Sequence, residues 1–262
     1  MEIRNKSAIV TGSSVGVGRA TAVLLAARGC NVVVNCRRTV QEAEETAEMV
    51  RAAGAEALVV RADVSQDAEC RRLVASGVER FGRLDILVNN AGMTRFVRFE
   101  DLEGLTPEMW AEIFETNVFG SFYCARAAVP HLRRAGGGAI VNVASVAGIQ
   151  ATGSSIAYAA AKAAVINMTL ALARTLGPEI RVNTVAPGAL DTRWIRDGIG
   201  EAAYEAVREA YRQTMPLRDI VPADAVAEAI VWLVEGACMT TGDVLTVDAG
   251  AHLGPGAPVN RR

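Results

Sequence analysis

Short apolar runs alternate with longer amphipathic segments along nearly the whole chain. The short runs are rich in Val and Ile and end in turn residues, which is typical of buried strands. We expect strands at residues 6–11, 31–35, 56–62, 84–88, 138–144, 180–186 and 243–247. The segments between them predict helices at residues 19–28, 40–53, 67–80, 107–134, 156–177 and 224–234. This alternation predicts an α/β fold built on a doubly wound parallel sheet.

The length of 262 residues suits one large α/β domain and does not require a second one. We place that domain at residues 1–250. Residues 189–220 are polar, mixed and compatible with helices, and they predict a mobile lid over a substrate. Residues 251–262 form a tail that is too rich in Pro and Gly to be expected to add an element of its own.

Composition argues against nucleic acids, membranes and metal ions as partners of this chain. The formal net charge of −2 gives no electrostatic case for nucleic-acid binding. No run reaches the roughly 18 uninterrupted apolar residues that a membrane span needs, and residues 1–6 leave no room for a signal peptide. The five cysteines are an odd number without a C-x-x-C pair, which is typical of reduced thiols in the cytoplasm. With two histidines and no cysteine cluster, we expect no metal site.

A glycine-rich turn follows the first expected strand. Gly12, Gly16 and Gly18 stand between that strand and the helix at 19–28. Glycines in this position let backbone N–H groups approach a pyrophosphate, and the helix N-terminus adds a partial positive charge. A tight turn with close helix packing is the alternative, and it does not explain three glycines at this spacing. The turn therefore predicts a dinucleotide cofactor.

The end of the second expected strand indicates which dinucleotide is bound. An acidic residue there would accept hydrogen bonds from the ribose 2′-OH of NAD. The strand ends instead in the neutral Asn35 and Cys36, followed by Arg37 and Arg38, which suit a 2′-phosphate. NADP(H) is therefore favoured. NAD(H) stays possible because Asn35 does not itself exclude it, and Arg38 also fits a solvated start of the next helix.

Three later loops extend this candidate cofactor site. Asp63 could accept a hydrogen bond from the adenine amino group, or it could cap the turn before the helix at 67–80. Asn89-Asn90-Ala91-Gly92 allows close backbone approach and side-chain bonds that fix neighbouring strands, with a simple turn as the alternative. Pro187-Gly188 ends the sixth strand, and ligands bind at the carboxyl ends of such strands.

The candidate chemistry lies between residues 145 and 162. Ser145 ends the fifth expected strand, and Tyr158 and Lys162 stand four residues apart on one face at the head of a helix. A phenol with a pKa near ~10 is a poor acid or base at neutral pH, but a cation beside it lowers that pKa. The serine can hydrogen-bond a carbonyl or alkoxide oxygen. A lone Tyr-x-x-x-Lys is usually only a helix face, so the surrounding motifs are what favour a proton-transfer site.

The helix expected at 107–134 is long for one uninterrupted element. Asn117 lies near its middle among apolar neighbours, where asparagine is a poor helix former. We expect Asn117 to bend the helix and hold a water molecule, and Pro130 to kink the helix or to start its final turn.

Together these motifs resemble the short-chain dehydrogenase/reductase family over about residues 4–250. The matching segments are Thr-Gly-x-x-x-Gly-x-Gly at 11–18, Asn-Asn-Ala-Gly at 89–92, Asn117, Ser145 with Tyr158 and Lys162, and Pro187-Gly188 with Thr192. The chain most resembles 3-oxoacyl-(acyl-carrier-protein) reductase-like members. The resemblance implies a single Rossmann-type domain with seven strands in the order 3-2-1-4-5-6-7. It also implies a homo-oligomer, a dimer or a tetramer, assembled through the helices at 107–134 and 156–177.

The resemblance implies a role for each catalytic residue. Tyr158 would be the general acid in reduction and the base in oxidation, and Lys162 would lower its pKa and hold the nicotinamide ribose. Ser145 would orient the substrate oxygen, and Asn117 would position a water linked to Lys162. With the motifs above, the residues expected at the cofactor are Gly12, Ser14, Val17, Gly18, Arg37, Arg38, Asp63, Val64, Asn90, Ala91, Gly92, Tyr158, Lys162, Pro187, Gly188 and Thr192.

Three functions follow from these expectations. The first is an NADP(H)-dependent oxidoreductase that moves hydride between nicotinamide and a small-molecule ketone or secondary alcohol. The second is an NAD-dependent dehydrogenase of sugars, polyols or other secondary alcohols. The third is a non-catalytic cofactor-binding regulatory protein, against which the intact catalytic set argues. Val247-Asp-Ala-Gly replaces the Asp-Gly-Gly that is more usual in such reductases, and this departure weakens any specific substrate assignment.

Overall fold

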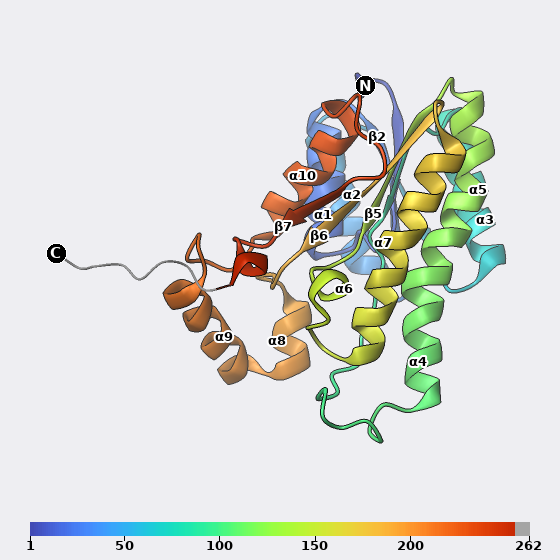
Figure 1. Cartoon of the computed structure of the whole chain (residues 1–262). Coiled ribbons are helices and arrows are strands. Elements are labelled where there is room, and N and C mark those ends of the chain that lie inside the picture. The colour runs from blue at the N-terminus through green and yellow to red at the C-terminus, as the bar shows by residue number, and fades with distance from the viewer. Residues whose placement is uncertain (255–262) are drawn as a thin grey trace.

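A parallel sheet of seven strands runs through the centre of the computed structural model, which describes residues 1–254 (Figure 1). The strands are β1 (Ser7–Val10), β2 (Asn31–Cys36), β3 (Ala57–Arg61), β4 (Ile86–Asn89), β5 (Gly138–Val143), β6 (Ile180–Pro187) and β7 (Val244–Val247). Their spatial order is β3-β2-β1-β4-β5-β6-β7, as the family resemblance implies. The four central strands are almost wholly buried, which explains their continuous apolar runs.

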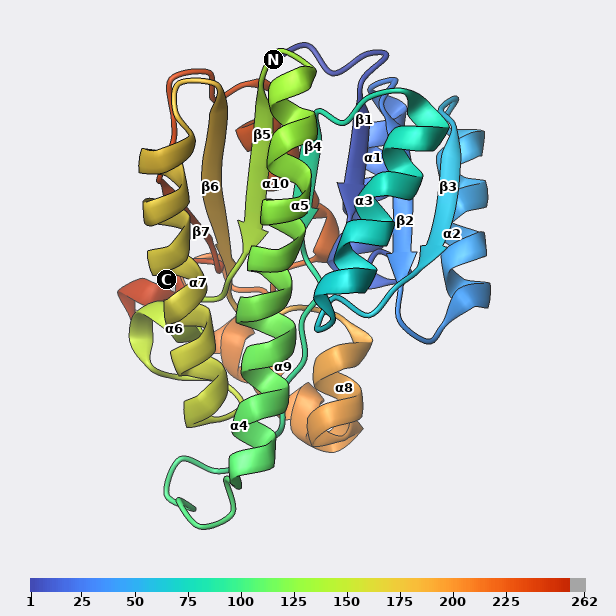
Figure 2. The ribbon, with the colours of Figure 1, turned by 90° about the vertical axis from the view of Figure 1, so that its right-hand side faces the viewer.

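Helices cover both faces of the sheet. α1 (Gly16–Ala27), α2 (Val40–Ala52) and α10 (Ala223–Glu235) pack on one face. α3 (Asp67–Phe81), α5 (Gly120–Arg134) and α7 (Ile156–Leu176) pack on the other, in front of the strands in Figure 2. The chain reverses direction across the sheet between β1 and β4, and such a switch point opens a crevice at the carboxyl ends of the strands.

The predicted helix at 107–134 is interrupted in the structure. It divides into α4 (Pro107–Phe114), a π-helical turn η1 (Glu115–Phe119) and α5, so Asn117 lies in the interruption itself. π-helical turns inside longer helices occur frequently at functional sites. The structure thus places an irregular turn at Asn117, where the sequence analysis expects a bend, and the bend itself stays a prediction. α5 continues through Pro130 to Arg134 as one element.

The predicted lid folds into two helices, α8 (Arg193–Ile199) and α9 (Glu201–Thr214), which lie beyond the carboxyl ends of the strands (Figure 1). A buried polar contact holds them together, because the hydroxyl of the fully buried Tyr204 donates to Asp191 Oδ1 at 2.7 Å. Arg196 donates to the same oxygen at 2.8 Å. The mobility expected of the lid stays a prediction.

Two short elements were not expected from the sequence. α6 (Ala147–Gln150) follows β5, and a 3₁₀ turn, η2 (Ala251–Leu253), begins the predicted tail. The rest of that tail, residues 255–262, lies outside the described residues.

Within residues 1–254, α7 alone has the length and mean hydropathy, 1.5, of a membrane-spanning helix. A core helix that packs on a sheet meets the same criteria, and α7 packs on β5, β6 and α4.

Two cysteines that are distant in the sequence meet between neighbouring helices. The Sγ atoms of Cys70 in α3 and Cys124 in α5 lie 3.5 Å apart, and both residues are free and buried.

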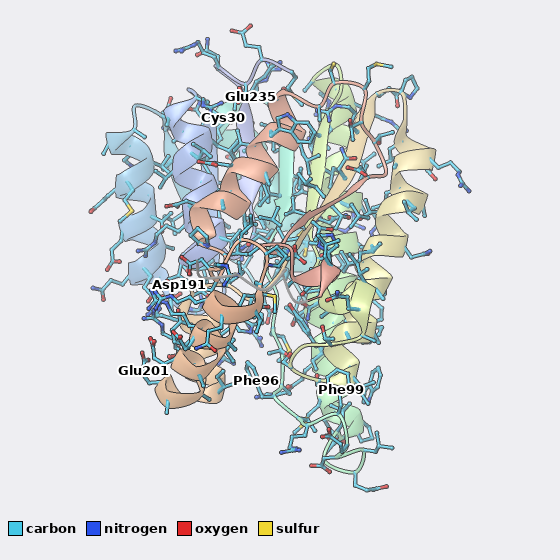
Figure 3. All side chains as sticks on the ribbon, turned by 60° about the vertical axis from the view of Figure 1, so that its left-hand side comes forward. Cys30, Phe96, Phe99, Asp191, Glu201 and Glu235 are labelled. Atoms are coloured by element: carbon cyan, nitrogen blue, oxygen red, sulfur yellow. The ribbon has the colours of Figure 1, made fainter. Side chains whose placement is uncertain are left out.

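Arg181, near the start of β6, anchors the C-terminal end of α10, which Glu235 marks in Figure 3. Its guanidinium donates to the carbonyls of Leu233 and Val234 at 2.7 Å and of Ala237 at 2.9 Å. We expect Arg181→Met to lower the free energy of unfolding by about 2 kcal/mol, because carbonyls at the helix end lose a charged donor. Urea denaturation measures the loss, with the exposed Arg174→Met as a control. Equal stability of the two variants would contradict a capping role for Arg181.

Candidate active site

One large cavity, of about 1110 Å³, opens at the carboxyl ends of the strands beneath the lid. Most of the predicted site residues line it: Gly12, Val17, Arg37, Asp63, Val64, Asn90, Ala91, Gly92, Ser145, Tyr158, Lys162, Pro187, Gly188 and Thr192. Four predicted residues do not contribute to its wall: Ser14, Gly18, Arg38 and Asn117. The fold therefore gathers motifs that are spread over 180 residues of sequence into one site.

Glycines allow the turn after β1 to pack closely against the loop after β4. Gly12 has a φ of +60°, and a Cβ atom there would lie 2.9 Å from Ala91 Cα. A Cβ atom on Gly18 would lie 2.5 Å from Nδ2 of Asn90. That Nδ2 donates to the carbonyls of Thr11 and Gly12 at 2.9 and 3.0 Å. Gly18 and Asn90 thus hold the glycine turn in place, Gly18 by leaving room for the Asn90 amide and Asn90 by its hydrogen bonds.

The start of α1 is suited to an anion. Its N-cap residue, Val15, provides no capping side chain, and its first turn contains no acidic residue. The first backbone N–H groups of a helix have no partner within the helix, and a phosphate satisfies them well. Gly16 and Val17 of this turn face the cavity. These residues fit the pyrophosphate of a dinucleotide.

Asn35 has a different role from the one that the sequence analysis gave it. Its side chain is 1% exposed and lies beneath the glycine turn, where Oδ1 accepts from Gly12 N at 3.0 Å. Its Nδ2 donates to the carbonyls of Val60 and Ala62, each at 3.1 Å. Because every polar atom of this amide has a backbone partner, Asn35 supports the turn, and its neutrality gives no information about the ribose.

Arg37 and Asp63, two predicted cofactor contacts, bind one another. Arg37 Nε lies 2.7 Å from Asp63 Oδ2 at the wall of the cavity. Asp63 Oδ1 also accepts from the backbone N and the hydroxyl of Ser65, at 3.0 and 2.8 Å. The arginine side chain is 53% exposed, so its guanidinium is free to reach a ligand. Arg38 is exposed outside the cavity wall.

Ser145, Tyr158 and Lys162 meet on the opposite side of the cavity. Ser155 caps α7 by accepting from Tyr158 N at 3.2 Å, which fixes the start of the helix that carries Tyr158 and Lys162. Lys162 Nζ donates to Val143 O at 2.9 Å and lies 5.5 Å from the centroid of the Tyr158 ring. Ser145 Oγ accepts from Ala147 N at 3.2 Å at the end of β5. The tyrosine and lysine thus share one helix face, as their spacing predicts.

Burial governs the acidity of the two α7 groups. Burial raises the pKa of Tyr158 to about 12, and the hydrogen bond with Ser145 acts in the opposite direction. Burial also lowers the pKa of Lys162 from 10.5 to about 8, because desolvation disfavours the ammonium. Burial thus acts against the lowering of the Tyr158 pKa that the sequence analysis expects from Lys162, and the group that lowers this pKa in the structure is Ser145.

Asn117 lies behind the cavity wall with one unpaired acceptor. Its Nδ2 donates to the carbonyls of Met93 and Ile113, both at 2.8 Å. Its Oδ1 is buried and has no partner among the described residues. A Cβ atom on Gly92 would lie 2.8 Å from that oxygen and 3.5 Å from Lys162 Nζ. An unpaired acceptor and an ammonium beside one bare glycine suit a bridging water, in line with the expected role of Asn117.

The structure adds two aromatic residues that the sequence analysis did not assign to the site. Trp194 of α8 lies over the catalytic side, with its ring centroid 6.4 Å from that of Tyr158. Phe96, in the loop after β4, lines the cavity and lies beside the lid helices in Figure 3. At the other end of the cavity, Arg193 Nη2 pairs with Glu42 Oε1 of α2 at 2.6 Å. The lid thus contacts both ends of the cavity.

Comparisons with known proteins agree with this arrangement. Residues 12–252 match the family model described as enoyl-(acyl carrier protein) reductase. A Streptomyces violaceoruber protein, provisionally named as ketoacyl reductase 2 of the granaticin polyketide synthase, is 50% identical over 246 residues, covering 94% of this chain and 96% of its own. The 3-oxoacyl-(acyl-carrier-protein) reductase FabG of Staphylococcus aureus is 34% identical over 253 residues, covering 95% and 98%.

Solved structures show the same relationship. A structure from Burkholderia xenovorans, provisionally described as a short-chain dehydrogenase/reductase, superposes with a TM-score of 0.88 at 36% identity and covers 95% of this chain and 98% of its own. A structure from Sinorhizobium meliloti 1021, provisionally described as a short-chain alcohol dehydrogenase, also gives a TM-score of 0.88, at 31% identity, with coverage of 97% and 98%.

Proposed function

We propose that the protein is an NADP(H)-dependent ketone reductase, because the chain belongs to the short-chain dehydrogenase/reductase family and is an oxidoreductase of ketoacyl-reductase type. In the reverse direction it would act as a dehydrogenase of the corresponding secondary alcohol. The observation that supports this proposal most directly is the single cavity. It is lined by the glycine turn after β1 at one end, where we propose that the pyrophosphate binds, and by Ser145, Tyr158 and Lys162 at the other.

The cofactor, when bound, supplies or accepts the hydride. The residues of the chain position the carbonyl and move the proton. Ser145 and Tyr158 donate hydrogen bonds to the substrate oxygen and stabilise the charge that develops on it. Tyr158 then transfers its proton to that oxygen. Lys162 holds positive charge beside the phenol, and Asn117 holds the water that connects the ammonium to solvent.

The substrate proposal is supported by the names of the relatives. One is named as a ketoacyl reductase and another as a 3-oxoacyl-(acyl-carrier-protein) reductase. We therefore propose a 3-oxoacyl compound as the substrate class. Oxidation of NADPH on addition of acetoacetyl-coenzyme A or of a panel of simple ketones tests the activity. Absence of turnover with every ketone would favour the non-catalytic alternative.

We expect wild-type protein to bind NADPH at least tenfold more tightly than NADH, about 1.4 kcal/mol, through Arg37. Arg37→Gln is expected to remove most of that preference by weakening NADPH binding alone. Fluorescence titration with both nucleotides measures the effect. Arg38→Gln is the matched control, because Arg38 lies outside the cavity wall. Equal or tighter NADH binding by the wild type would indicate the NAD-linked alcohol dehydrogenase instead.

We also propose that the chain forms a homo-oligomer. Large apolar side chains are exposed on α7 and around the start of α5, among them Phe119, Phe122 and Leu170, which are 39–45% exposed. Light scattering distinguishes a dimer or a tetramer from a monomer, and a monomer would contradict this proposal. The cytoplasmic location expected from the free thiols stays a prediction.

A further inference from the structure

The loop after β4 and helix α8 meet along one side of the cavity at two points. At the first, a Cβ atom on Gly92 would lie 3.6 Å from Trp194 Cη2. At the second, a Cβ atom on Gly198 would overlap the ring of Phe96. Residues 92 and 96 are four apart on the loop, and 194 and 198 are one turn apart on α8. The two contacts therefore form a continuous line that we call the 92–198 seam.

Gly198 is an unusual choice at its position. It lies in the last turn of α8, before the C-cap at Gly200, and glycine is a poor helix former. Its φ does not fall in the left-handed region, so backbone conformation does not require it. Close packing of the Phe96 ring against the helix does require it. A side chain at this position would displace Phe96.

Phe96 is also held from the loop side. Val97 N donates to Ser154 O at 2.9 Å, and the hydroxyls of Thr94 and Ser154 lie 2.5 Å apart. Ser154 immediately precedes the cap of α7, the helix that carries Tyr158. The loop around Phe96 is therefore tied to the catalytic helix, while the ring itself rests on the lid. Figure 3 shows Phe96 next to the lid helices and Phe99 farther from them.

The wall of the cavity near Phe96 is largely apolar. Val97, Phe99, Ile195, Ile199 and Val207 line this part of it, together with the polar Arg98 and Ser154. The apolar side chains bind the hydrocarbon part of a ligand. A sugar or polyol would leave the hydroxyls that face them unpaired, whereas an acyl chain or a fused carbocycle would bury its surface there.

We propose that Phe96, seated on Gly198, is the gate that sets how large an apolar ketone can reach Tyr158. This inference rests on the proposed function, since it concerns the substrate of the same site. Phe96 acts on the body of the substrate and takes no part in proton transfer. Removing the ring enlarges the cavity beside the seam, and placing a methyl group at 198 moves the ring.

The test compares two saturated cyclic ketones, cyclohexanone and the larger 1-decalone. Phe96→Ala is expected to raise the ratio of kcat/KM for decalone over cyclohexanone at least tenfold, with the affinity for NADPH unchanged. Gly198→Ala is expected to change the same ratio at least fivefold in the wild-type background and to have no further effect in the Phe96→Ala background, because the methyl group then has no ring to displace. Asp197→Ala, an exposed neighbour on α8 outside the cavity wall, is the matched control.

An unchanged ratio in Phe96→Ala would overturn the gate, as would an effect of Gly198→Ala that is equal in both backgrounds. Calorimetric binding of decalone to the enzyme with NADP⁺ gives a second readout that does not depend on hydride transfer. If the wild type binds decalone, with an affinity that depends on Phe96, but reduces neither ketone, then the proposed function fails and the gate stands. If the wild type reduces both ketones with no dependence on Phe96, then the gate fails and the proposed function stands.

Discussion

Tyr158→Phe is expected to lower kcat for ketone reduction about 10³-fold, because the substrate oxygen then has no positioned proton donor. The phenol is well placed for this role: it lines the cavity, and Ser145 hydrogen-bonds it. Its pKa of about 12 keeps the phenol protonated at working pH, so the proton to be donated is present. Stopped-flow measurement of NADPH oxidation at saturating ketone isolates this step. The affinity for NADPH should change little, since only a hydroxyl is removed.

Tyr123→Phe provides the control for the loss of a phenol elsewhere. Tyr123 lies on α5, outside the cavity wall, and its removal should leave kcat unchanged. A Tyr158→Phe enzyme that kept most of its turnover would mean that another group donates the proton. Such a result would remove the proposed mechanism while leaving the family and the fold as they are.

The sheet and most of the site could be predicted because both depend on local patterns. Apolar runs separated by helices specify a parallel sheet, and the carboxyl ends of its strands must lie at one edge. Gly12, Asp63, Asn90, Ser145 and Gly188 all follow strands or end them, so the fold brings them to one cavity whatever the details of packing. The residue types at these positions were therefore enough to predict that they line one site.

Side-chain direction and burial were harder to infer. Asn35 stands near the end of β2, beside the expected ribose, yet its amide turns inward to Gly12, Val60 and Ala62. The spacing of Tyr158 and Lys162 showed that they are neighbours, but not that burial would dominate both pKa values. Three-dimensional packing decides each of these properties.

The contact between Phe96 and Gly198 in the 92–198 seam could also not be predicted from the sequence. The two residues are about a hundred positions apart, and a mixed polar stretch gives no sign of which of its faces turns inward. The only local signal was a glycine inside a segment that otherwise forms a helix. Cys70 and Cys124 are a similar case, since their 3.5 Å separation depends on the packing of α3 against α5.

Lys162→Met is expected to lower turnover strongly and to stabilise the fold at the same time. The wild-type ammonium is 4% exposed, and its only hydrogen-bond partner among the described residues is a carbonyl, that of Val143. The fall of its pKa from 10.5 to about 8 corresponds to a penalty of about 3 kcal/mol when the group is charged. The lost hydrogen bond offsets about 1 kcal/mol of this. A net gain of about 2 kcal/mol at pH 7 is therefore expected, together with a loss of turnover of at least about 10²-fold.

The pH dependence identifies the origin of that gain. Below pH 8 the lysine is charged in both the folded and the unfolded state, so the wild type carries the full penalty. Between pH 8 and 10.5 the folded protein loses the proton first, so the wild type gains stability relative to the variant as the pH rises. Above 10.5 both states are neutral and the penalty is gone. Urea denaturation between pH 7 and 11 should show the stability advantage of Lys162→Met shrinking across this window. An advantage that does not depend on pH would come from packing of the methionine side chain. Burial of the lysine charge would then cost the wild type no stability that its function has to justify.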